Sequence, residues 1–207
     1  EIPVTAKVRL GWESAEHLPE IARNAEAGGA AWLTVHARTR VQLYRPPVDW
    51  AALARAREAV RIPVVANGDI NTTGDLERCA AQSGCHAFMI GRGSMGRPWL
   101  FRQVRGLEPH GRELDLGRFR ALVGDYAARL LAAGASEHAA LGRLKQWLRL
   151  GAPAFAEIDA LFQLIKKQPS LEQALEHLDS PALLVPSRRA RREGACPGEG
   201  STIAATP

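Results

Sequence analysis

The chain has 207 residues, of which 46% are apolar and 24% charged, and this is the composition of an ordinary globular protein long enough to bury a core. It excludes a charged disordered chain, and no apolar run approaches the ~20 residues of a membrane span. The formal charge of +5 permits a polyanionic partner without requiring one. Three sparse cysteines and the lack of a visible secretory signal predict no disulfide framework, no metal site and a reducing, cytoplasmic setting.

The first half of the chain alternates predicted strands with predicted helices. Each strand is short and mostly apolar, and each helix carries its apolar residues on one side. Four consecutive strand-helix units predict an α/β fold with a parallel sheet and crossover helices. The predicted strands are Pro3–Leu10, Ala31–His36, Pro63–Asn67 and Ala87–Gly91, and the helices after the last three are Trp50–Val60, Thr73–Gln82 and Gly96–Arg102.

The pattern changes after Gly106. From Leu114 to Leu178 apolar residues recur at helical spacing, which predicts an appended all-α helical bundle. The tail from Pro186 is rich in Arg, Gly, Pro and Ser, and this composition predicts disorder. We therefore expect three segments, namely an α/β part over 1–106, a helical domain over 112–180 and a disordered basic tail over 186–207.

Two glycine motifs follow the third and fourth predicted strands, ANGD at Ala66–Asp69 and IGRG at Ile90–Gly93. Glycine lets backbone N–H groups approach an anion closely, and the guanidinium of Arg92 could grip phosphate oxygens. The strand-helix units recur about every 30 residues, as in a (β/α)8 barrel, where the last two such loops commonly bind phosphate. The alternative is that these glycines only form tight turns.

Lys7 and His36 lie on the first two predicted strands. An unpaired ammonium at Lys7 would be costly to bury, so it indicates either a cation aimed at an electron-rich heterocycle such as a reduced flavin, or an ion pair. His36 closes its strand, where a histidine is either a ligand contact or a hydrogen-bonded structural residue.

Two segments combine cations with aromatic residues. The segment His36–Arg40, followed by Tyr44, suits a phosphate-rich or stacked-base partner, or is an ordinary solvated loop. In the helical region Arg143 and Lys145 flank Trp147, which indicates either a nucleic-acid surface or a tryptophan of the helical core with a wet cationic face.

Five segments, in this order, resemble the tRNA-dihydrouridine synthases. The similarity is greatest to the bacterial branch that modifies uridine 16 of the D-loop, and it extends over about residues 1–180. It implies the last four βα units of an FMN-binding TIM barrel and a helical tRNA-binding domain. These enzymes reduce the C5–C6 double bond of a uridine with FMN, which NADPH recharges. The segments are Thr5–Trp12, Thr34–Trp50, Pro63–Ile70, Ser83–Phe101 and Leu144–Leu148.

The resemblance implies a role for each matching residue. We also expect no metal ion, no membrane partner and a monomeric state. The residues implied in FMN binding are Lys7, His36, Asn67, Gly68, Asp69, Gly91 and Arg92. The residues implied in tRNA binding are Arg38, Tyr44, Arg143, Lys145, Gln146 and Trp147.

One departure from the family is large. Its general acid is a cysteine in an N-x-G-C-P loop of the first half of the barrel, and this motif does not occur in the 207 residues. We therefore expect a fragment or a truncated homologue, catalytically inactive on its own. Two alternatives remain: another FMN barrel of the dihydroorotate or dihydropyrimidine dehydrogenase kind, or a noncatalytic RNA-binding module.

Overall fold

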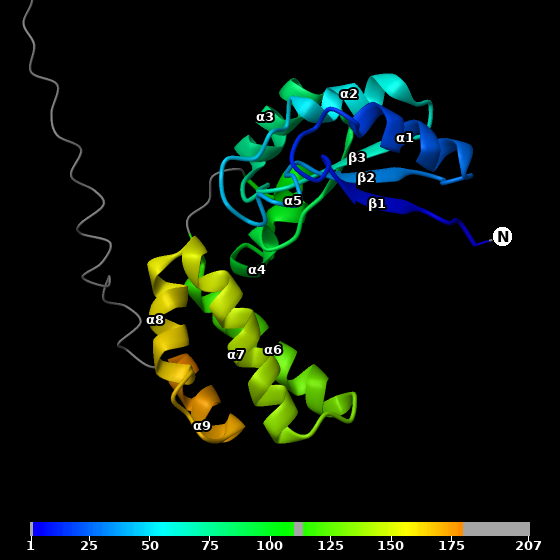
Figure 1. The fold of residues 1–207 in the computed structure, drawn as a ribbon. Helices are drawn as coiled ribbons and strands as arrows, with labels where there is room; N and C mark the ends of the chain where they lie inside the picture. Colours follow the sequence, from blue (N-terminus) through cyan, green and yellow to red (C-terminus); the bar gives the residue numbers. More distant parts are fainter. Residues whose placement is uncertain (1, 110–113, 180–207) are drawn as a thin grey trace, which may run out of the picture. The chain divides into compact units, whose positions relative to one another are not determined.

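A computed structural model describes residues 2–109 and 114–179, and these divide into two compact units between Asp115 and Leu116. The first unit is an α/β structure with a four-stranded parallel sheet in the order β1-β2-β3-β4. Its elements are β1 (Ala6–Arg9), α1 (Leu18–Ala27), β2 (Leu33–His36), α2 (Ala52–Ala59), β3 (Val64–Asn67), α3 (Thr73–Ser83), β4 (Ala87–Met89), α4 (Gly93–Gly96) and α5 (Leu100–Val104). Figure 1 shows β1, β2 and β3 side by side.

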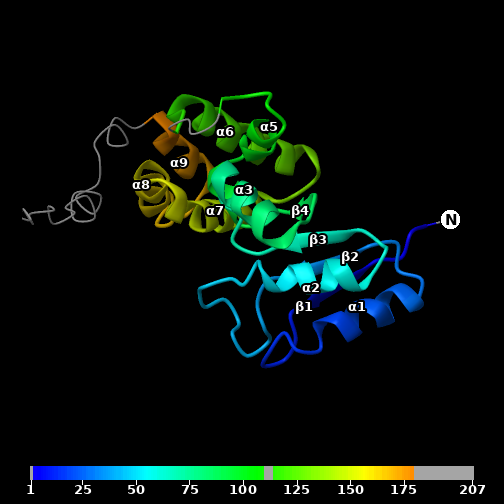
Figure 2. The same cartoon turned by 90° about the horizontal axis from the view of Figure 1, so that it is seen from above.

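Helices α1, α2 and α3 pack against one face of this sheet (Figure 2). Leu33 and Val35 of β2 are fully buried there, because apolar residues alternate along the strand and point to the helices. Leu18 of α1, Leu53 of α2 and Cys79 of α3 cover them, also fully buried. The predicted α/β fold with a parallel sheet is confirmed.

The opposite face of the sheet carries polar side chains. Lys7 of β1 pairs in register with Thr34 of β2, and two residues further along Arg9 pairs with His36. Lys7 is exposed, so the expected burial cost for its ammonium does not arise in this structure. The polar row therefore faces away from the core formed with α1, α2 and α3.

The predicted strand Pro3–Leu10 is longer than β1. Backbone pairing nevertheless continues past its ends, since the carbonyl of Val4 accepts from Ala31 at 2.8 Å and the amide of Leu10 donates to Arg38 at 3.1 Å. The helical start predicted near Gly96–Arg102 is partly right, since α5 begins at Leu100, but no single helix runs through this range. Two short helices, α4 and α5, occupy this region instead, because Pro98 keeps Arg97 out of the helical conformation (φ −131°, ψ 67°).

The described residues of the second unit form helices and turns. The elements are α6 (Leu116–Ala132), α7 (Glu137–Gly151), η1 (Ala152–Ala154), α8 (Ala156–Ile165), α9 (Leu171–Glu176) and η2 (His177–Asp179). Ser136 caps α7 by accepting from the amide of Ala139, and Ser170 caps α9 in the same way. No helix of the described residues is long and apolar enough to cross a membrane. The predicted disordered tail over 186–207 lies outside the described residues.

Candidate functional site at the carboxyl ends of the strands

The ends of the four strands place polar residues side by side. In the sheet register Arg9 of β1 lies beside His36 of β2, His36 beside Asn67 of β3, and Asn67 beside Met89 of β4. The side-chain amide of Asn67 donates to the carbonyl of Met89 at 2.8 Å. Residues from three separate βα units thus meet at one edge, as the parallel sheet requires.

His36 is partly buried, and its pKa is lowered from 6.5 to about 4. Burial is the largest cause, and the positive charges of Arg9, Lys7 and Arg38 add to it. The imidazole is therefore neutral at pH 7. Its Nε2 lies 3.4 Å from Nη1 of Arg38. Because a guanidinium only donates, Nε2 is the acceptor and the proton resides on Nδ1.

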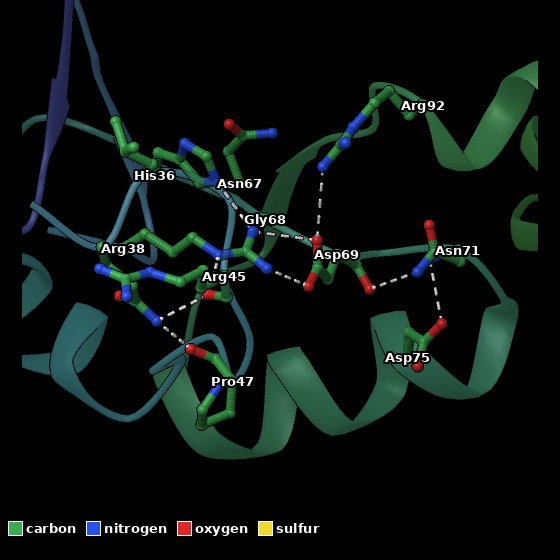
Figure 3. A network of polar contacts seen from close by, with 12 residues as sticks. His36, Arg38, Arg45, Pro47, Asn67, Gly68, Asp69, Asn71, Asp75 and Arg92 are labelled. Carbon is green, nitrogen blue, oxygen red and sulfur yellow. Dashed lines mark hydrogen bonds and ion pairs between the residues drawn. The ribbon is translucent and has the colours of Figure 1, made fainter. Parts of the chain in front are cut away.

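Arg38 connects two strand-end loops. Its guanidinium forms a two-pronged ion pair with the carboxylate of Asp69, and its Nε donates to the carbonyl of Arg45 at 3.0 Å (Figure 3). Arg92 approaches the same carboxylate at 4.0 Å from the loop after β4. The carboxylate of Asp69 is thus turned toward arginines, and Arg38 itself is only 1% exposed.

The glycine loops pack directly on each other. Gly93 has no room for a side chain, since a Cβ there would lie 2.3 Å from the carbonyl oxygen of Ile70. Gly68 has a φ of +126°, and its carbonyl accepts from the indole of Trp50 at 2.9 Å. A Cβ on Gly91, by contrast, would meet nothing within 4 Å. Open space therefore lies beside Gly91, next to the exposed side chain of Arg92.

The N-terminus of α3 is already satisfied by its own residues. Thr72 accepts from the amide of Asp75, and the Asp75 carboxylate accepts from the amides of Thr72 and Asn71 at 2.8 and 3.0 Å (Figure 3). A negative charge thus occupies this helix end, and an anion at this edge has better partners near Gly91 and Arg92.

Tyr44 is 63% exposed, and two guanidinium groups lie near its ring, that of Arg9 at 5.6 Å and that of Arg92 at 5.0 Å from the ring centre. It is open to a partner, as an RNA contact requires. The buried and paired guanidinium of Arg38 is not open in this way, and an RNA contact would require it to leave Asp69.

The candidate RNA residues of α7 fall into two groups. Arg143 and Gln146 are exposed. The ammonium of Lys145 donates to the carbonyl of Gln168 at 2.7 Å, and the ring of Trp147 packs on aromatic rings of α6. Lys145 and Trp147 are thus engaged within the second unit, whereas Arg143 and Gln146 are exposed on α7.

The sequence marks Arg9, with Lys7, as a polar residue at the end of the first strand, but no FMN or RNA contact was predicted for it. In the structure its guanidinium donates to the carbonyls of Thr39 and Leu43, at 2.9 and 2.8 Å, in addition to lying over Tyr44. The sequence could have indicated this position, because Lys7 and Arg9 are two residues apart in a strand and residues at this spacing lie on the same face of a sheet.

Cys79 and Cys85 are buried in the core formed with the helices. Burial raises the pKa of the Cys79 thiol to about 11 and also raises that of Cys85. Neither is poised for proton transfer at the polar edge. Within residues 2–109 and 114–179 no group of three metal-ligating side chains is found.

Comparison with known proteins gives one consistent family. The family model for dihydrouridine synthase matches residues 1–180. The tRNA-dihydrouridine(16) synthase of Aquipseudomonas alcaligenes is 40% identical over 193 residues, covering 90% of this chain and 58% of that protein. That of Cupriavidus necator is 42% identical over 187 residues (87% and 57%), and that of Escherichia coli K12 is 38% identical over 182 residues (86% and 56%). The chain thus spans little more than half the length of these relatives.

Proposed function

The chain belongs to the dihydrouridine synthase family, and on that premise we propose that it forms the cofactor-binding and RNA-binding part of a bacterial tRNA-dihydrouridine synthase. The observation that carries the proposal is the polar edge of the sheet, where His36 and Asn67 lie in register beside the open loop at Gly91 and Arg92. The reaction is reduction of the C5–C6 double bond of a D-loop uridine, with NADPH as the source of electrons.

The residues at this edge fit an FMN. The space beside Gly91 and the exposed guanidinium of Arg92 suit its phosphate. Asp69 does not repel that phosphate, because Arg38 already neutralises its carboxylate. Asn67 and Gly68 shape the adjoining loop. The exposed ammonium of Lys7 and the Nδ1–H of neutral His36 supply donors for the polar atoms of the flavin ring.

When bound, FMN supplies the hydride that reduces the uracil ring. The part of this chain is to bind and orient. The positive charge of Lys7 favours negative charge that develops near it, and His36 donates one hydrogen bond without changing its protonation at neutral pH.

Among the residues that the structure describes, no cysteine is placed to protonate the uracil. The N-x-G-C-P loop does not occur in the sequence, Cys79 and Cys85 are buried with raised pKa values, and Cys196 lies outside the described residues. We therefore propose that these 207 residues alone do not turn over, and that the four βα units are half of a (β/α)8 barrel.

The RNA-binding part is assigned to residues 112–180, with Arg143 and Gln146 as its exposed contacts and Tyr44 as a contact from the α/β part. Lys145 and Trp147 serve this surface indirectly, by holding α7 in place. A cytoplasmic monomer acting without a metal ion completes the proposal.

The test compares FMN with riboflavin, which lacks the phosphate. Flavin fluorescence titrations of the whole chain should give tighter binding for FMN, and Arg92→Ala should remove the difference while leaving riboflavin unaffected. Equal affinities for the two flavins in the unaltered chain would overturn the cofactor assignment.

A second titration uses unmodified tRNA over a series of salt concentrations. The affinity for tRNA should fall steeply as the salt concentration rises, because lysine and arginine side chains that bind the phosphates release counterions from the RNA. A flat salt dependence would instead favour an FMN barrel with a small-molecule substrate. Incubation with FMN, NADPH and tRNA should yield no dihydrouridine, and its detection would contradict the proposed inactivity.

A further inference from the structure

Trp12 is an exposed tryptophan paired with an arginine of a different loop. It follows β1, and 70% of its surface is exposed. The guanidinium of Arg40, in the loop after β2, lies 5.9 Å from the centre of the indole. Neither Trp12 nor Arg40 is among the residues assigned above to FMN binding or to tRNA binding. The exposed indole presents a flat apolar ring to solvent.

The backbone fixes the position of this pair. The amide of Arg40 donates to the carbonyl of Gly11 at 2.9 Å, and the amide of Val41 donates to the carbonyl of Trp12 at 3.0 Å. Gly11 allows the turn, since a Cβ there would lie 2.1 Å from the carbonyl oxygen of Ser14. Backbone hydrogen bonds thus join the loop that carries Trp12 to the loop that carries Arg40.

The same loop carries further exposed apolar side chains. Val41 is 47% and Leu43 48% exposed, and Leu43 has a φ of +55°, a left-handed conformation that L side chains adopt with strain. The side chain of Gln42 holds the loop by donating to the carbonyls of Arg45 and Pro47. The loop therefore presents apolar groups outward from a rigid frame.

The charge around the pair selects the class of partner. Residues 36–48 contain three arginines and no aspartate or glutamate, and the loop after β1 contains Glu13 and Glu16. Arg38 is already paired with Asp69, which leaves Arg40 and Arg45 as the guanidinium groups of this loop. A polyanion with flat apolar faces fits this combination. An unpaired nucleobase stacks on an indole, and its phosphates favour the nearby guanidinium groups.

We infer that Trp12, backed by Arg40, is a stacking platform for an unpaired base of the RNA substrate, distinct from the contact at Tyr44. This inference rests on the proposed function, because it takes tRNA as the partner. Arg40 lies over the indole, so that the ring can be held between a cation and a base.

The test measures the affinity of the whole chain for an unmodified tRNA transcript at several salt concentrations. Trp12→Ala should weaken binding about 5-fold to 100-fold at every salt concentration, because the loss is of stacking and not of charge. Trp12→Phe should restore most of the affinity. Arg40→Ala should weaken binding and also reduce the slope of log affinity against log salt by about one phosphate contact.

Trp32→Ala is the matched control. Trp32 is 38% exposed and precedes β2, at the opposite end of the strands from Trp12, so its replacement should leave tRNA affinity unchanged. Circular dichroism of each variant checks that the fold is intact.

The outcomes separate this inference from the proposed function. If tRNA binding is tight and salt-dependent but Trp12→Ala leaves it unchanged, the stacking platform is overturned and the proposed function stands. The exposed surface at Trp12 would then favour a protein partner. No binding of tRNA by the unaltered chain would overturn the proposed function and the platform with it. An equal loss of tRNA affinity in Trp12→Ala and Trp32→Ala would also overturn the platform, since the effect would not be specific to the carboxyl ends of the strands, where Trp12 lies.

Discussion

The guanidinium of Arg38 holds the carboxylate of Asp69 in a two-pronged ion pair that joins the loop after β2 to the loop after β3. Arg38 is 1% exposed and Asp69 sits at a φ of +46°, so a buried cation and a left-handed backbone conformation meet at one contact. Arg38 also donates to the carbonyl of Arg45, which fixes the far end of its own loop. The candidate site is therefore held together by residues that need not touch a ligand.

Replacing Arg38 should destabilise the first unit. Arg38→Ala leaves the Asp69 carboxylate without its two donors and the carbonyl of Arg45 without its hydrogen bond, which should lower the free energy of unfolding by about 3 kcal/mol. Urea denaturation followed by circular dichroism measures the loss. Arg38→Lys should recover only part of it, because an ammonium cannot bridge both oxygens in the same plane.

Arg57→Ala is the control for that experiment. Arg57 pairs with Glu58 at 3.4 Å on the surface of the same unit, where the two side chains are 44% and 66% exposed. Its loss should cost less than about 1 kcal/mol. Equal destabilisation by Arg38→Ala and Arg57→Ala would show that the buried pair does not hold the loops.

His36 should make stability depend on pH. Its pKa is about 4 in the folded state and 6.5 ordinarily, so between these values the unfolded chain binds more protons. Stability should therefore rise as the pH increases from about 4 to about 6.5, by at most about 3 kcal/mol, and this contribution should be constant above that range. His36→Asn should reduce the difference in unfolding free energy between about pH 7.5 and about pH 4.5.

His138→Asn, an exposed histidine of α7, serves as the control and should retain the dependence of the unaltered chain. The assignment fails if His36→Asn loses stability toward acid as steeply as the unaltered chain does.

The order of elements in the first unit could be predicted because local patterns determine it. Alternating apolar residues mark β2, and the capping pair Thr72 and Asp75 marks the start of α3. The break between α4 and α5 also has a signal in the sequence, Pro98, which the predicted helical start near Gly96–Arg102 did not take into account. Where periodicity and proline disagree, the fixed backbone of proline decides.

The contacts within the site were less predictable. His36 and Asn67 could be placed at one edge, since parallel strands end together. The pairing of Arg38 with Asp69 could not, because 31 residues separate them and no short-range pattern specifies which arginine meets the carboxylate. For Trp147 the sequence left both a surface and a core position open, and its contacts with Phe119 and Tyr126 show packing between α6 and α7.

The two glycines of the last strand-end loop should respond differently to alanine. Gly93→Ala forces a methyl group against the carbonyl oxygen of Ile70, where a Cβ would lie at 2.3 Å, and should cost about 1–3 kcal/mol of stability. Gly91→Ala meets nothing within 4 Å and should leave stability nearly unchanged, while weakening FMN by filling the space proposed for its phosphate. Thermal unfolding and flavin titration of both variants test this, and a destabilised Gly91→Ala with unchanged FMN affinity would contradict it.

Helix α7 should separate into a packing face and an RNA face. The ring of Trp147 lies 5.6 Å from that of Phe119 and 5.0 Å from that of Tyr126, so Trp147→Ala should destabilise the second unit by about 3 kcal/mol. Arg143 is exposed, so Arg143→Ala should leave the unfolding free energy within about 0.5 kcal/mol and weaken tRNA binding, with a shallower salt dependence. Denaturation and tRNA titration on the same two variants distinguish the faces. If Arg143→Ala bound tRNA as tightly as the unaltered chain at low salt, this side of α7 would not face the RNA.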